Sequence, residues 1–251
     1  MLATRSEGGS PRANYGLDAP GVVRVMALLG ISLIGAGLIL RGVSAQGSAL
    51  SRLGITLLWP GGSFAITALL MLASSHFGKH RARDRLLDRL ALRGDEVVLD
   101  VGCGHGLMLI GAAKRLSAGH AMGIDLWSQS DQQDNSALAT MKNALAEGVS
   151  DRVTVRDGDM RTLPLEDASV DVVVSSLAVH NVRTQVDRAR SIREMARVVR
   201  PGGRIGLLDI AHVGDYARVL RESGWLVERN GVTPWIFPPT RELVARKPTS
   251  T

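Results

Sequence analysis

The sequence predicts an α/β protein with a parallel sheet, preceded by two membrane-spanning helices. Two long, almost uncharged apolar runs lie within the first 75 residues. Beyond residue 80, short apolar runs typical of buried strands alternate with amphipathic helical runs. A glycine-rich turn joins the first of these strands to a helix. Ligands of such sheets bind beyond the carboxyl ends of the strands, so we expect a functional site there.

The chain divides by composition into three parts. Residues 1–20 are predicted to be a disordered tail, residues 21–75 a two-span membrane hairpin, and residues 80–248 an α/β domain. The net charge of +6 is spread along the 251 residues and is accompanied by only four Trp, two Tyr and three Phe. A basic stripe with interleaved aromatics is therefore absent from the sequence, and no nucleic-acid partner is expected. The single cysteine, Cys103, excludes an intramolecular disulfide and fits a reducing compartment.

Both apolar runs are long enough to cross a bilayer. Val22–Leu40 carries one charge, Arg24, near its start, and Leu53–Ala73 carries none. A helical span needs about 20 predominantly apolar residues. The stretch at 59–62, Trp-Pro-Gly-Gly, is expected to kink or interrupt the second helix. Two alternatives remain for these runs, a signal peptide for the first and buried core helices for both.

Basic residues predict the orientation of the hairpin. Lys79, Arg81 and further arginines follow the second run, and three arginines precede or begin the first. The connecting loop has two, Arg41 and Arg52. The positive-inside rule then places both termini and the α/β domain in the cytoplasm, with the hairpin in a membrane that we take to be a bacterial inner membrane.

The elements of the α/β domain follow one another in regular alternation. A helix is expected over Arg81–Leu92, and longer helices over Gln133–Gly148 and Thr184–Val199. The predicted strands are Glu96–Val101, His120–Leu126, Arg152–Arg156, Val170–Ser175 and Gly203–Asp209. This order predicts a parallel sheet with helices on both faces.

The turn after the first strand has the residues of a nucleotide-binding loop. Gly102, Gly104 and Gly106 alternate with other residues and lack the Cβ atoms that would block a close approach to the backbone. Alone, this turn fits dinucleotides and other nucleotide-like cofactors equally well. Cys103 lies inside the turn, where packing explains a small side chain.

Residues after the second and third strands predict an adenosine site. Asp125 ends the second strand, and its carboxylate can accept both hydroxyls of a ribose. Asp159 ends the third strand region and can accept from an exocyclic amine. Leu126 and Met160 follow these two acids and would enclose the adenine ring.

The α/β half of the chain resembles the class I S-adenosylmethionine-dependent methyltransferases, most closely their small-molecule and lipid-type branch. The resemblance covers residues 81–248 and rests on Asp-Val-Gly-Cys-Gly-His-Gly at 100–106, Gly-Ile-Asp-Leu at 123–126, Asp-Gly-Asp-Met-Arg-Thr-Leu-Pro-Leu at 157–165 and Glu-Met-Ala-Arg-Val-Val-Arg-Pro-Gly-Gly at 194–203. It implies a seven-stranded, mostly parallel, doubly wound Rossmann-like sheet, with a reversed terminal hairpin near residues 224–228 and 242–247. It also implies S-adenosylmethionine as cofactor, with Asp100 in the glycine motif and Ser175 at the end of the fourth strand among the cofactor-binding residues.

His180, just past the fourth strand on the substrate side, is the candidate catalytic base. The alternative is a histidine that only shapes the pocket floor. No grouping of residues has the spacing of a metal site, so no metal is expected. These observations together predict a membrane-anchored methyltransferase that acts on a small lipophilic molecule or lipid. A nucleotide-cofactor-dependent oxidoreductase and a non-catalytic cofactor-binding adaptor are the two alternatives.

Overall fold

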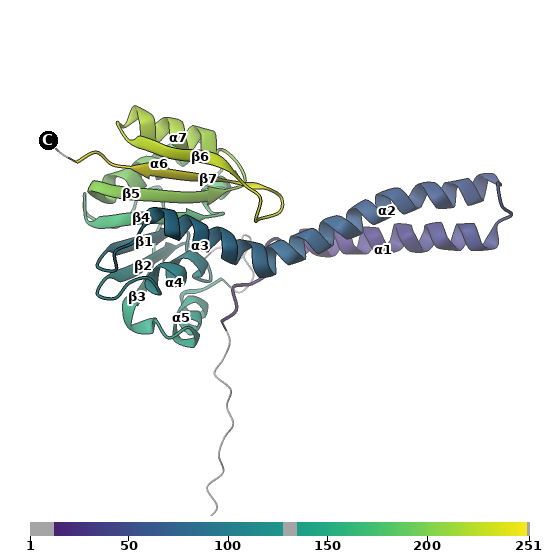
Figure 1. The fold of residues 1–251 in the computed structure, drawn as a ribbon, viewed down its shortest axis with the longest axis horizontal. Helices are drawn as coiled ribbons and strands as arrows, with labels where there is room; N and C mark the ends of the chain where they lie inside the picture. The colour runs from purple at the N-terminus through teal and green to yellow at the C-terminus, as the bar shows by residue number, and fades with distance from the viewer. Residues whose placement is uncertain (1–12, 128–134, 250–251) are drawn as a thin grey trace, which may run out of the picture. The chain divides into compact units, whose positions relative to one another are not determined.

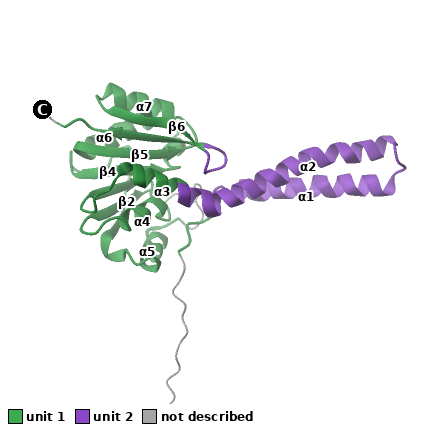
Figure 2. Ribbon diagram, in the orientation of Figure 1, with its two compact units in different colours: residues 1–16, 82–233, 240–251 green, residues 17–81, 234–239 purple. Residues whose placement is uncertain are grey.

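The computed structural model describes residues 13–127 and 135–249, and they form two compact units. Unit 1 contains residues up to Gly16, Ala82–Thr233 and Thr240 onward, and unit 2 contains Leu17–Arg81 with Pro234–Pro239 (Figure 2). Unit 2 therefore combines the predicted hairpin with a short segment from far along the chain.

The hairpin of unit 2 consists of α1 (Pro20–Val43) and α2 (Ala49–Ala73), joined by a short turn (Figure 1). Glycines allow the two helices to touch. A Cβ built on Gly54 would lie 2.7 Å from the carbonyl oxygen of Gly37, and one on Gly30 would lie 2.8 Å from the backbone nitrogen of Ala65. Large apolar side chains are exposed along both helices, among them Leu28, Ile31, Leu38, Ile39, Leu53, Ile66 and Leu69.

The second helix is continuous, so of the kink or interruption expected at residues 59–62, the interruption does not occur. Pro60 lies inside α2. Proline removes one helical hydrogen bond, and the rest of the helix can continue around it where a neighbour packs closely. Gly61 supplies that packing, since a Cβ there would lie 2.9 Å from both the Ile34 backbone nitrogen and its Cγ1 atom.

Two helical segments follow α2 without a break. The π-helix η1 covers Ser74–Gly78, and α3 covers Lys79–Leu90. The boundary between the units falls within α3, after Arg81. From Ala82 onward α3 packs in unit 1, where Leu86 and Leu90 lie over Gly206 of the sheet and Leu87 lies over Gly111.

Unit 1 is built on a seven-stranded sheet in the order β3-β2-β1-β4-β5-β7-β6. The first five strands in the chain run parallel to one another, and β7 runs antiparallel to both β5 and β6. The strands are β1 (Val97–Val101), β2 (His120–Asp125), β3 (Val153–Asp157), β4 (Val170–Ser176), β5 (Val199–Asp209), β6 (Leu226–Thr233) and β7 (Thr240–Arg246). The predicted fold class, including the reversed terminal hairpin, is confirmed.

Helices cover both faces of this sheet. One face is covered by α3, α4 (Leu107–Ala113) and α5 (Ala137–Ala146). The other face is covered by α6 (Gln185–Val198) and α7 (Val213–Glu222). The short helices η2 (Ser150–Arg152) and η3 (Val179–Asn181) occupy connections. Buried side chains of α6 and α7, such as Ile192, Met195 and Leu220, pack on Leu99, Val173 and other residues of the central strands.

The structure differs from the sequence expectation in three further places. β5 begins at Val199 instead of residue 203, because Val199 pairs with Val170 ahead of an irregularity in the ladder. The helix α7 has no counterpart among the predicted elements. Of the predicted disordered tail, residues 1–12 lie outside the described residues, whereas Tyr15 is 7% exposed and its hydroxyl donates to Glu147. Burial of that ring gives residues 13–16 a fixed place on α5.

Candidate functional site

The candidate site lies where β1, β2, β3 and β4 end, since these neighbouring parallel strands bring their carboxyl ends to one edge. The loop from Gly102 to Gly106 leaves β1 there and leads into α4. The structure thus brings the predicted cofactor-binding residues to a single edge of the sheet.

Each of the three glycines in this loop has a backbone conformation that favours glycine. The φ angles of Gly102, Gly104 and Gly106 are 73°, 49° and 86°. A Cβ on Gly102 would lie 2.4 Å from the Ala178 Cβ, and one on Gly106 would lie 2.9 Å from the Thr140 Cγ2. Gly102 and Gly106 are therefore required by the protein atoms that surround them.

Asp100 lies beneath the loop as a buried carboxyl group with one unused oxygen. The residue is 1% exposed, and its Oδ2 accepts from the backbone N–H of Leu109 at 2.8 Å. Its Oδ1 has no hydrogen-bond partner among the described residues. Burial, and secondarily the charge of Asp125, raises the pKa of Asp100 to about 8. A positively charged ligand group at this loop would favour the ionised form of Asp100, so this carboxyl group fits a cationic ligand group.

Asp125 joins the end of β2 to the glycine loop. Its Oδ2 accepts from the Gly104 N–H at 2.8 Å, and its Oδ1 accepts from the Trp127 N–H at 2.7 Å and from Asn135 at 3.3 Å. Leu126, the next residue, is 63% exposed. A carboxylate held beside the loop, followed by an exposed apolar side chain, fits the predicted ribose and adenine contacts.

The remaining predicted cofactor residues differ in how available they are. Met160 lies over the loop, with its Cε 3.6 Å from the position of a Cβ on Gly102. The Asp159 carboxylate accepts from the Arg161 guanidinium at 2.9 Å, and this pairing lowers the pKa of Asp159. The hydroxyl of Ser175, a residue only 2% exposed, donates to the Val101 carbonyl at 2.6 Å. A ligand bound to Asp159 would have to share the carboxylate oxygens with Arg161. The hydrogen bond of Ser175 links β4 to β1.

His180 forms a pair with a carboxylate that the sequence analysis did not single out. Its Nδ1 lies 2.5 Å from Oδ1 of Asp209, and its backbone N–H donates to Oδ2 at 3.0 Å. Asp209 is 2% exposed at the end of β5 and also accepts from the Ile210 N–H and the Tyr216 hydroxyl. Because a carboxylate only accepts, the neutral form of the His180 ring carries its proton on Nδ1 and has its lone pair on Nε2.

A signal for Asp209 was present in the sequence, since an acid ends the fifth strand just as Asp125 ends the second. Two residues of α5 were also missed. Thr140 donates to the Gly104 carbonyl at 2.5 Å, and the Asn143 amide donates to the carbonyls of His105 and Asn14. These hydrogen bonds hold the glycine loop in place. Neither residue was predicted from the sequence, because both lie on a helix and not at the end of a strand.

The surroundings of Cys103 and His212 indicate structural roles for both residues. Burial, together with the neighbouring acids Asp100 and Asp125, raises the pKa of the Cys103 thiol well above its usual value. The thiol is therefore protonated, and its sulfur fills the space beside Gly123. His212 is the N-cap residue before α7, and its Nδ1 lies 4.0 Å from Oδ2 of Asp215.

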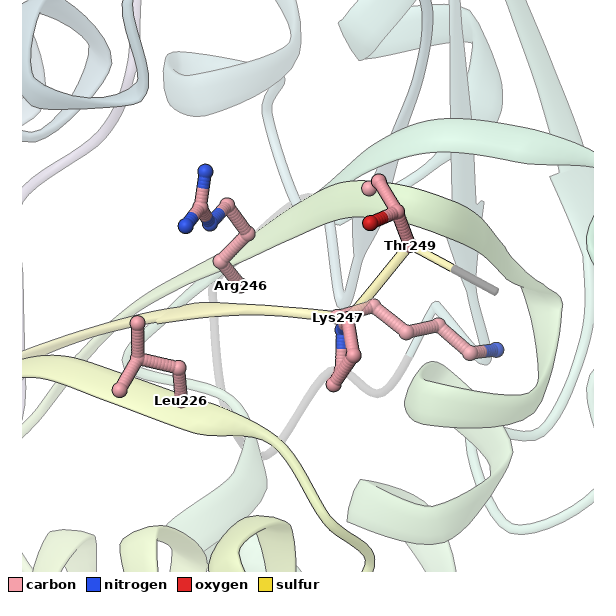
Figure 3. Close-up of a pocket in the computed structure, with 6 residues that line it drawn as sticks. Leu226, Arg246, Lys247 and Thr249 are labelled. Atoms are coloured by element: carbon pink, nitrogen blue, oxygen red, sulfur yellow. The ribbon is translucent and has the colours of Figure 1, made fainter. Parts of the chain in front are cut away.

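A shallow cavity of about 350 Å³ lies at the opposite edge of the sheet, near the start of β5 (Figure 3). Its lining is Gly202, Leu226, Arg246, Lys247, Pro248 and Thr249. The Lys247 ammonium donates to the carbonyls of Ala196 and Val199, so it caps the end of α6. This cavity is separate from the candidate site.

Comparison with known proteins agrees with this geometry. Residues 99–207 match a family described as Methyltransferase domain. The chain is 37% identical over 129 residues to 27-O-demethylrifamycin SV methyltransferase of Amycolatopsis mediterranei (strain S699), covering 51% of this chain and 44% of that protein. It is 32% identical over 145 residues to the chloroplastic 2-phytyl-1,4-beta-naphthoquinone methyltransferase of Arabidopsis thaliana, covering 57% and 52%. A SAM dependent methyltransferase from Aquifex aeolicus shares the fold, with a TM-score of 0.53, 19% identity, and coverage of 65% of this chain and 88% of that one.

Residues 99–207, fewer than half of the 251 residues, are similar to this methyltransferase family. The predicted resemblance to methyltransferases and the predicted fold class are confirmed, and the predicted cofactor, S-adenosylmethionine, is that of the SAM-dependent class to which the solved structure belongs. The chain spans about half the length of the two curated relatives.

Proposed function

We propose that the chain is a membrane-anchored, S-adenosylmethionine-dependent methyltransferase that acts on a small lipophilic molecule or lipid. The observation that carries the proposal is the buried, half-satisfied carboxyl group of Asp100 beneath a glycine loop, with Asp125 beside it. A cofactor that combines a positively charged methionine part with a ribose and adenine suits this combination. When bound, S-adenosylmethionine supplies an activated methyl group on a positively charged sulfur.

The side chains divide the work of binding. Asp100 and the loop from Gly102 to Gly106 would receive the methionine part, Asp125 the ribose, and Leu126 with Met160 the adenine. Asp159 would accept a hydrogen bond from the adenine amine and share its carboxylate between that amine and Arg161. Each assignment places a charged or apolar group opposite its complement, and alignment of the two reactants is the chief contribution that the protein makes to such a transfer.

His180 would remove a proton from the acceptor. Asp209 holds the ring through Nδ1, which leaves the lone pair of Nε2 available to accept the proton. The negative charge of Asp209 then stabilises the imidazolium that forms. An acceptor that must lose a proton, such as a hydroxyl or an activated carbon acid, fits this pair.

The hairpin supports a membrane anchor. Its helices are long and apolar enough to cross a membrane by length and composition, and 17% and 11% of their most apolar stretches are buried. Core helices of a soluble protein would be covered far more completely. Two basic residues, Arg41 and Arg52, flank the turn of the hairpin, whereas its far end is followed by four, Lys79, Arg81, Arg83 and Arg85. This excess favours a cytoplasmic α/β domain. The relative named for a 2-phytyl naphthoquinone supports a lipophilic acceptor.

The cofactor assignment is tested by isothermal titration of the purified full chain with S-adenosylhomocysteine and, separately, with NAD. We expect binding of the first only, and loss of that binding in Asp125→Ala. The matched control is Asp151→Ala, which removes an exposed carboxylate from η2. Binding of NAD alone would favour the oxidoreductase alternative.

The activity is tested by incubation of the chain with methyl-labelled S-adenosylmethionine and a lipid-and-metabolite extract. We expect label in a lipophilic product, and loss of that label in His180→Ala. Cofactor binding with no labelled product from any extract would favour the adaptor alternative. Release of the chain from membranes by carbonate washing would contradict the anchor.

A further inference from the structure

The loop between β6 and β7 belongs to the hairpin unit rather than to the α/β unit. Figure 2 shows residues 234–239 in the colour of the hairpin. The loop reads Pro-Trp-Ile-Phe-Pro-Pro, and its contacts are with the segment that leaves α2, residues 74–81. We refer to residues 74–81 and 234–239 together as the exit collar.

Specific contacts hold the collar together. The backbone N–H of Phe237 donates to the Ser74 hydroxyl at 2.8 Å, across 163 residues of sequence. Gly78 lies so close to the Trp235 carbonyl that a Cβ on the glycine would be 1.9 Å from that oxygen. The Arg81 guanidinium lies over the Trp235 ring, 5.6 Å from its centroid. These contacts fix aromatic side chains at the point where the apolar helix ends.

The collar combines exposed apolar groups with an exposed basic side chain. Phe77 is 69% exposed, and Arg81 is exposed as well. The only acidic residue among residues 17–81 and 234–239 is Asp18, which is paired with Lys79 at 3.2 Å. Aromatic rings beside basic side chains at the end of an apolar helix suit the boundary between lipid tails and headgroups.

We propose that the exit collar binds anionic phospholipid headgroups, with Trp235 at the level of the lipid carbonyls and Arg81 on the lipid phosphate. The proposal rests on the proposed membrane anchor and adds to it a lipid-binding site to which the loop between β6 and β7 contributes. Phospholipid is the occupant that the observations favour because the collar continues directly from α2, whose apolar side chains are exposed.

The test uses the full chain in nanodiscs of phosphatidylcholine with or without phosphatidylglycerol, and lipids brominated at shallow or deep positions as quenchers of tryptophan fluorescence. The signal of Trp235 is the difference between the wild-type chain and Trp235→Phe. We expect shallow bromines to quench Trp235 more than deep ones. We also expect brominated phosphatidylglycerol to be enriched around Trp235 about fivefold over brominated phosphatidylcholine, the effect of one basic side chain near the surface.

Two variants test whether Arg81 causes the preference for phosphatidylglycerol. Arg81→Gln should remove the preference for phosphatidylglycerol and leave shallow quenching in place. Arg93→Gln, which replaces a 77% exposed arginine of unit 1, should change neither the lipid preference nor the shallow quenching. Equal quenching by the two lipids in the wild-type chain, or an unchanged preference in Arg81→Gln, would overturn the proposal.

Trp59 separates this proposal from the anchor itself. The residue lies in α2 and is 79% exposed, so an inserted hairpin must bring it into contact with lipid tails. Absence of deep quenching in the difference between the wild-type chain and Trp59→Phe would contradict the anchor. Deep quenching of Trp59 without quenching of Trp235 would contradict the collar alone. Trp225→Phe is the reference for a ring that is 5% exposed.

Discussion

Asp100 should couple cofactor binding to the release of a proton. The pKa of this carboxyl is raised from 3.8 to about 8, first by burial and then by the charge of Asp125. That difference corresponds to about 6 kcal/mol in favour of the protonated form in the folded, ligand-free protein. A positively charged ligand group beside the unused Oδ1 would favour the ionised form instead, so the proton should leave when the cofactor binds.

The sign of the effect follows from the raised pKa. The folded state holds this proton more tightly than the unfolded chain, so the contribution of Asp100 to stability is complete below about pH 4 and is lost as the pH rises towards 8. The affinity for the cofactor should change in the opposite sense. It should increase with pH by up to about tenfold per unit while Asp100 remains protonated in the free protein, and level off near pH 8.

The assay is isothermal titration of the full chain with S-adenosylhomocysteine, whose amino acid part carries an ammonium group. Between pH 6 and 7.5, we expect the affinity to rise and the observed enthalpy to depend on the ionisation enthalpy of the buffer. Asp100→Asn is the matched control, because an amide can still accept from the Leu109 N–H and cannot ionise. A pH-independent affinity in the wild-type chain, with no dependence on the buffer, would refute the reasoning.

Three further predictions concern other parts of the chain. His180→Ala should lower turnover by about 10²- to 10⁴-fold with little change in cofactor affinity, and equal losses in steady-state turnover and in titrated affinity would contradict a role as base. Gly102→Ala should lower the melting temperature of the chain more than Gly148→Ala does, because both bring about 1–2 kcal/mol of left-handed strain but only the first meets a Cβ, 2.4 Å away. Gly54→Leu should lower the melting temperature in detergent, whereas Gly62→Leu, with no atom within 4 Å, should not; similar melting for both would contradict the close helix contact.

Local patterns in the sequence carried most of the fold. The alternation of apolar strands with amphipathic helices predicted the parallel sheet, and five of the strands lie within a few residues of their predicted bounds. The spacing of the glycines and of Asp125 after them predicted the loop and its neighbour, because φ angles and strand ends depend on nearby residues. The continuity of α2 through Pro60 depended on close packing against α1, and no local pattern contains that information.

The sequence by itself determined the class of fold, the family resemblance, and the residues that surround the glycine loop. Only the tertiary structure decided which side chains are paired: Asp209 with His180, Arg161 with Asp159, and Phe237 with Ser74. It also decided that one oxygen of Asp100 is left without a partner among the described residues. The physical reason is that backbone conformation and hydrophobic periodicity are local properties, whereas burial and pairing depend on segments brought together from distant parts of the chain.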